Sequence, residues 1–312
     1  MTEASTEKKR LHKGKAIGEA FRFVFTNIPH LIATSALTLI VLAAFSLLFN
    51  LFFGAALVEG MVDAQMPALL AGDVMGASIA PMIYMFTDPA TIIYTLLSIF
   101  LSLVLGGIFA IRWHRSALFG SDAEGTGFGL EFSSSLIKYV TRLIALYLLV
   151  IALIVVPSIL AGIVPFAAPL VLVGAIAALY VSGRLSLALP AAALDIEDMD
   201  LEGSWQQTSG HGWGIFFANI FMSLIMVAIA FVLGLLMIPF VGTGAADLGT
   251  LGGSSSDLRD SLIAQQQAQL IPTALISFIT IPLLTGLTTS FLSYVYFQLG
   301  KPPAWVEESR AG

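Results

Sequence analysis

One arginine inside an apolar stretch is the first candidate for chemistry in this sequence. Arg184 lies in ALYVSGRLSLALPAAAL, 19 residues after Pro165. An arginine at the centre of a bilayer costs on the order of 2.5 to 3.5 kcal/mol, so it is a candidate for binding an anionic lipid headgroup or solute. The alternative, which we favour, is that Arg184 lies near the end of a span and extends its side chain to water.

A second basic site lies where an apolar run ends, and it consists of four consecutive residues: Arg112, Trp113, His114 and Arg115. Basic and aromatic side chains in this place suit contact with anionic lipid headgroups. They equally suit the ordinary anchoring of a span at the membrane surface. The remaining tryptophans also lie near span ends, where we expect them to be interfacial anchors: Trp205, Trp213 and Trp305.

The other reactive residues do not form a recognisable metal or catalytic site. The four histidines lack the spacing of a helical zinc pair: His12, His30, His114 and His211. The acidic run from Asp195 to Glu202 lacks EF-hand spacing, and helix capping explains part of it. The methionines between Met61 and Met85 lack the regular spacing of a Cu(I) site. Because the chain has no cysteine and no nucleotide-binding or hydrolase motif, we expect no catalytic residue, metal or cofactor.

Composition identifies the elements that must position these residues. Of 312 residues, 57% are hydrophobic and only 11% are charged, whereas soluble domains carry about 25% charged residues. Six apolar runs are long enough to cross a hydrocarbon core about 30 Å thick: 31–57, 90–111, 143–164, 169–189, 215–241 and 272–299. We therefore predict an all-α polytopic membrane protein with six transmembrane helices in a single integral membrane domain, residues 1–312.

Basic residues indicate the orientation of these spans. Six spans place both termini on one face, and that face carries 13 of the 14 lysines and arginines. The positive-inside rule then predicts that both tails are cytoplasmic, the basic tail at 1–15 and the tail at 301–312. Residues 58–89 and 242–271 become loops on the outer side. We expect no nucleic-acid partner, because the sequence does not indicate a basic surface that would bind one.

Similar segments precede the first, third and fifth spans. Residues 16–27, 128–140 and 201–209 each mix aromatic and polar residues at helical spacing, which is typical of helices in the membrane interface. One interpretation is three repeats of an interfacial helix followed by a helical hairpin. The alternative is that any polytopic protein needs amphipathic entry segments.

Two stretches carry a resemblance to known proteins. The segment GRLSLALPAAALDIEDMDLEGSWQQTSGHGWGIF, residues 183–216, resembles a recurring pattern in bacterial polytopic membrane proteins. Those proteins are similar to the membrane domain of glycerophosphoryl diester phosphodiesterases, so the resemblance implies a location in a bacterial inner membrane. The matching residues are Arg184, Leu185, Leu189, Pro190, Ser204, Trp205, Thr208, Gly210 and Trp213. The segment RWHRSALFG, residues 112–120, resembles a signature of alphaproteobacterial proteins. The phosphodiesterase catalytic domain has no counterpart here, so the resemblance implies an architecture and not an activity.

Two functions from different classes remain. The first is a non-enzymatic scaffold or accessory subunit whose spans pack against other membrane proteins as well as lipids. Small residues that allow close helix contacts support it, among them Gly106, Gly107, Gly162 and Gly174. The alternative is a transporter or lipid-handling protein in which Arg184 or the 112–115 cluster meets an anionic lipid or solute. The oligomeric state is left open by the sequence.

Overall fold

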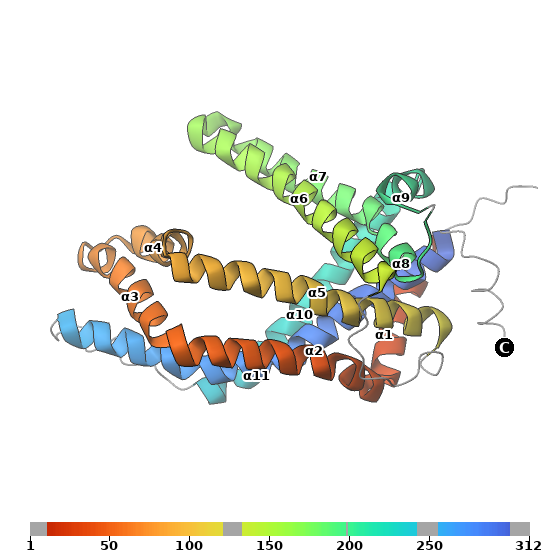
Figure 1. Ribbon diagram of the computed structural model, residues 1–312. Helices are drawn as coiled ribbons and strands as arrows, with labels where there is room; N and C mark the ends of the chain where they lie inside the picture. The colour runs from red at the N-terminus through yellow and green to blue at the C-terminus, as the bar shows by residue number, and fades with distance from the viewer. Residues whose placement is uncertain (1–10, 121–132, 198, 242–254, 300–312) are drawn as a thin grey trace, which may run out of the picture. The chain divides into compact units, whose positions relative to one another are not determined.

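The computed structural model describes residues 11–120, 133–197, 199–241 and 255–299 (Figure 1). Within these residues the regular structure is helical and contains no strand, which confirms the all-α prediction. The helices are α1 (Lys13–Thr26), α2 (Ile28–Phe49), α3 (Ala55–Leu70), α4 (Val74–Thr87), α5 (Pro89–Phe119), α6 (Ser134–Ile163), α7 (Ala168–Leu185), α8 (Ala188–Ala193), α9 (Leu201–Gln207), α10 (Gly212–Val241) and α11 (Ser255–Leu299). The tail residues 1–10 and 301–312, loop residues 242–254, Asp198 and Trp305 lie outside the described residues.

Six helical segments among the described residues are long and apolar enough to cross a membrane. They are Ile28–Phe49, Pro89–Phe119, Ser134–Ile163, Ala168–Ala193, Gly212–Leu235 and Ile276–Leu299. Each coincides with one of the six predicted runs, so the six-span prediction is confirmed. The chain is an integral membrane protein.

The predicted repeat has separate helices at two of its three places. α1 and α9 are distinct short helices that precede spans, as predicted. The described part of the middle segment instead forms the first turns of α6, with the Ser133 hydroxyl accepting a hydrogen bond from the Leu136 N–H at its start. Residues 121–132 lie outside the description.

The chain divides into two compact units. Unit 1 comprises residues 1–36, 104–228 and 282–312, and unit 2 comprises residues 37–103 and 229–281. Four helices contribute to both units: α2, α5, α10 and α11.

In unit 1, α6 and α7 form a helical hairpin closed by a 3-10 turn, Pro165–Ala167. We call the end where α6 and α7 meet α8 and α9 the hairpin base, and the end at Pro165–Ala167 the hairpin tip. All four buried residues of α6 lie in its first 13 positions: Ser135, Leu136, Tyr139 and Leu146. The hairpin base is therefore part of the core of unit 1, while side chains toward the tip are mostly exposed.

In unit 2, the region predicted as the first outer loop is helical. α2 continues through a π-helical segment, Asn50–Gly54, into α3, and α4 packs against α3. Val58, Val62 and Met66 of α3 form an apolar cluster with residues of α11. The Arg259 guanidinium donates to both carboxylate oxygens of Asp63, at 2.6 and 3.2 Å. This hydrogen bond lowers the pKa of Asp63 below its ordinary value.

The second predicted outer loop also differs in its helical part. The sequence predicts a loop over 242–271 and a new span beginning at Pro272, whereas α11 starts at Ser255 and runs without interruption to Leu299. Proline is tolerated within such helices, because neighbouring groups can satisfy the freed backbone carbonyl.

Candidate functional site

Arg184 is bound inside unit 1, at the hairpin base. Its side chain lies near the end of α7 and only 9% of the residue is exposed. Nε donates to the Thr208 hydroxyl at 3.1 Å, and Nη2 donates to the Trp205 carbonyl oxygen. The guanidinium carbon lies 3.5 Å from the centre of the Trp205 ring, in cation–π geometry. Arg184 therefore connects the end of α7 to α9.

The backbone of Arg184 completes the connection. α7 ends at Leu185, so carbonyl groups in its last turn lack partners within the helix. The Ser204 hydroxyl donates to the Arg184 carbonyl at 2.6 Å, and the Thr208 hydroxyl lies 3.4 Å from the same oxygen. α9 is held in place by its own cap, in which the Asp200 carboxylate accepts from the Gly203 N–H at 2.8 Å. The motif residues Arg184, Ser204, Trp205 and Thr208 thus form one hydrogen-bonded group.

Two further arginines hold α8 at the hairpin base. Arg115 Nε of α5 donates to the Ala193 carbonyl at 2.8 Å, and Arg142 Nη1 of α6 donates to the Ala188 carbonyl at 2.9 Å. Every residue of α8 is buried, and four of the six are alanines that allow close approach. We call Arg115, Arg142 and Arg184 the arginine clamp. Each of these arginines donates a hydrogen bond to a backbone carbonyl of the chain. Buried carbonyl groups need such a partner, because they are shielded from water.

Trp113 and His114 face the inside of unit 1. Both are fully buried. The Trp113 indole N–H donates to the Gly286 carbonyl at 2.9 Å and to the Ser290 hydroxyl at 2.8 Å, and His114 Nδ1 lies 2.7 Å from the Ser293 hydroxyl. These contacts join α5 to α11. They favour a packing role for both residues over contact with a lipid headgroup, because neither side chain has exposed surface.

The other predicted site residues have different surroundings. Arg112 is half-buried and has interactions of its own, so the 112–115 cluster is divided between two environments. Trp205 and Trp213 are 38% and 60% exposed, and their role as interfacial anchors stays a prediction.

The acidic run serves local structure where it is described. Lys138 of α6 donates to Asp195 at 2.8 Å and to Glu197 at 3.1 Å, and both pairs are exposed. The hydrogen bond from Lys138 lowers the pKa of Asp195. Among the described residues no group of three histidine or acidic side chains is placed to hold a metal ion.

The polar contacts between α5 and α11 were not predicted from the sequence. Their signal was available, because the last span carries Ser290 and Ser293 three residues apart, on one helix face. Comparison of the chain with protein-family models, with curated proteins and with solved structures finds no match. The resemblance to the phosphodiesterase membrane domain therefore stays a prediction.

Proposed function

We propose that this chain is a non-enzymatic scaffold or accessory subunit of a membrane assembly, and that the hairpin tip is the part that packs against another membrane protein. The observation that carries the proposal is the uneven covering of the spans. Only 6% of the most apolar window of α6 is buried within the chain, compared with 44% for the Ile276–Leu299 span.

Close packing within the hairpin supports this role. A Cβ atom at Gly174 of α7 would lie 2.3 Å from the Leu153 carbonyl oxygen of α6, so the two helices are in tight contact there. Helix association in lipid depends on such van der Waals packing, because lipid tails are as apolar as leucine. A hairpin that is closed by its own contacts and exposed on its remaining faces can accept the spans of a partner without changing its fold.

The proposal includes a location in a bacterial inner membrane with both termini in the cytoplasm. Support comes from the 13 basic residues assigned to the terminal face and from the resemblance of residues 183–216 to bacterial membrane domains. Single cysteines at Ala71 and Ser209 test the orientation. In intact cells, a membrane-impermeant thiol reagent should label A71C and leave S209C unlabelled; the reverse pattern would refute this topology.

Site-specific crosslinking tests the scaffold proposal. Because the chain has no native cysteine, a thiol reagent reacts only with the cysteine that is introduced. A photoactivatable thiol reagent on I159C, near the tip of α6, should capture one membrane protein in native membranes. I93C on α5 is the matched control, because Ile93 and Ile159 are 59% and 57% exposed. The captured protein should co-purify stoichiometrically with the wild-type chain and be lost from an I159W variant.

Other results would contradict the scaffold role. Equal capture from both positions would indicate crowding in the membrane. Lipid adducts alone at I159C, with an anionic lipid or solute retained in native extraction, would favour the transporter or lipid-handling alternative.

A further inference from the structure

Six of the described cationic side chains of unit 1, all except Arg22 and Arg112, fall into two groups. Four have acceptors inside the chain: Arg115, Lys138, Arg142 and Arg184. Lys13 and Lys15, in the first turn of α1, have no hydrogen bond and no carboxylate partner within the described residues. Cations are also unfavourable at a helix N-terminus, where the helix dipole is positive. No described residue therefore neutralises these two ammonium groups.

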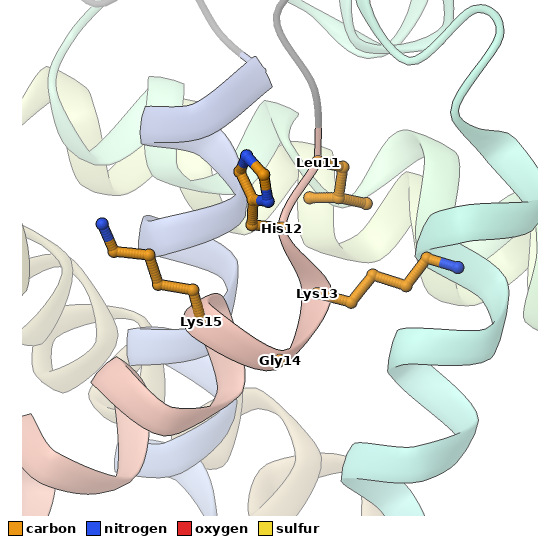
Figure 2. A pocket seen from close by; sticks show the side chains of 5 residues that line it. All are labelled: Leu11, His12, Lys13, Gly14 and Lys15. Carbon is orange, nitrogen blue, oxygen red and sulfur yellow. The ribbon is translucent and has the colours of Figure 1, made fainter.

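The segment that carries the two lysines lines a surface pocket. Five consecutive residues form it, Leu11 to Lys15 (Figure 2). The segment is attached to the end of α11, because the His12 backbone N–H donates to Gln298 Oε1 at 2.9 Å. Figure 2 shows that Lys13 and Lys15 extend to opposite sides of the turn, with Lys13 directed toward α10. The two lysines thus have different surroundings although they share one helical turn.

Lys13 lies against the aromatic end of α10. Its ammonium is 6.0 Å from the centre of the Phe217 ring. Its alkyl chain passes over Gly214, where an added Cβ atom would lie 3.2 Å from Lys13 Cε. Phe217 and Trp213 are 57% and 60% exposed, in the first turns of the Gly212–Leu235 span. The Phe217 ring in turn lies 6.2 Å from the Trp213 ring, centre to centre. A cation beside this exposed aromatic pair at the end of a span combines a headgroup contact with a surface for an acyl chain.

From this arrangement we infer that Lys13, Trp213 and Phe217 form a binding site for an anionic phospholipid. The Lys13 ammonium binds the lipid phosphate, and the acyl chain lies along the Trp213 and Phe217 rings. Charge complementarity selects this occupant, because the Lys13 ammonium lies beside an exposed aromatic ring of α10 and has no carboxylate partner among the described residues. The site does not depend on which protein occupies the hairpin tip.

Lipid retention by the full chain tests this inference. The purified protein is reconstituted in phosphatidylcholine bilayers doped with phosphatidylglycerol, extracted, and analysed by native mass spectrometry. K13A should weaken phosphatidylglycerol binding about fivefold, since an interfacial lysine contributes about 1 kcal/mol. K13R should retain binding, which separates loss of the charge from loss of the fold.

K15A is the matched control, and it should leave phosphatidylglycerol binding within about twofold of the wild type. Equal losses in K13A and K15A would overturn the inference, because they would indicate a diffuse basic surface. No loss in K13A would also overturn it. Displacement of the lipid by millimolar inorganic phosphate would show that the site recognises free phosphate and not a phospholipid.

Discussion

The two ends of the α6–α7 hairpin are held in opposite ways. At the base, the arginine clamp binds the carbonyl groups of α8 and α9, and Arg184 is almost completely buried. At the tip, the contacts run chiefly between α6 and α7, and Phe166 in the connecting turn is 89% exposed. One hairpin therefore combines a base fixed by polar contacts with a tip whose outer faces are mostly exposed within the described part of unit 1.

The difference shows that polar residues near span ends can serve the packing of neighbouring helices. An arginine near a span end suggests a site for an anionic lipid or solute, but each arginine of the clamp donates to a backbone carbonyl of the chain, and Arg184 also donates to the Thr208 hydroxyl. The apolar tip has few such constraints and is the surface left for lipids or another protein. Three pairs of variants test this comparison through thermal stability in detergent, measured as loss of the monodisperse protein.

Replacing Arg184 should have the largest effect. R184A removes the donors to Thr208 and Trp205, so the Trp205 carbonyl loses one of its hydrogen bonds. We expect the midpoint of thermal denaturation to fall by about 5–10 °C, since hydrogen bonds to charged groups contribute about 1.5–3 kcal/mol each. R184K keeps the charge but not the planar fork, and should give an intermediate midpoint. An unchanged midpoint in R184A would mean that the base is not fixed by the clamp.

Adding a methyl group at the helix contact of Gly174 should have a smaller effect on the midpoint. G174A places a methyl group against the Leu153 carbonyl and must move α7 away from α6. Overpacking costs about 1–3 kcal/mol, so the midpoint should fall by about 2–6 °C. G162A is the control, because a Cβ atom there has no neighbour within 4 Å. It should leave the midpoint unchanged or raise it slightly, as alanine favours helix. Equal effects in both variants would argue against tight packing at Gly174.

The exposed ion pair at the base should have the smallest effect. Because Lys138 lowers the pKa of Asp195 in the folded chain, the pair stabilises the protein above the unfolded pKa of aspartate, and this contribution is lost as the pH falls through the folded value. D195N should lack this part of the acid dependence, with a midpoint change of no more than about 1–2 °C near neutral pH. K138Q should behave in the same way. Identical acid profiles in wild type and both variants would show that the pair makes no contribution.

The spans were predictable because each leaves a long apolar run in the sequence. Their continuations were not, since α2 passes through a π-helical segment into α3, and α11 begins well before its apolar part. Local composition alone does not show where a helix continues beyond the hydrocarbon core.

The surroundings of the site residues were harder to predict than their positions. Arg184 was expected to reach water or to bind an anionic lipid or solute, yet it binds α9, about 20 residues further along the chain. The position of Trp113 at the end of an apolar run suited an interfacial anchor, but its acceptors Gly286 and Ser290 are in the last span. Such pairings depend on which helices become neighbours, and a single sequence does not contain that information.

The bonds of Trp113 also set an order for biogenesis. Of its two acceptors, the one that is synthesised first is the Gly286 carbonyl, 173 residues later in the chain. At about 5–20 residues per second, the ribosome needs roughly 10 to 35 seconds to synthesise that interval. During this time the indole of α5 is already in or near the membrane without its final acceptors. The core of unit 1 can therefore close only after the last span is made, and the earlier spans wait for it as an incomplete intermediate.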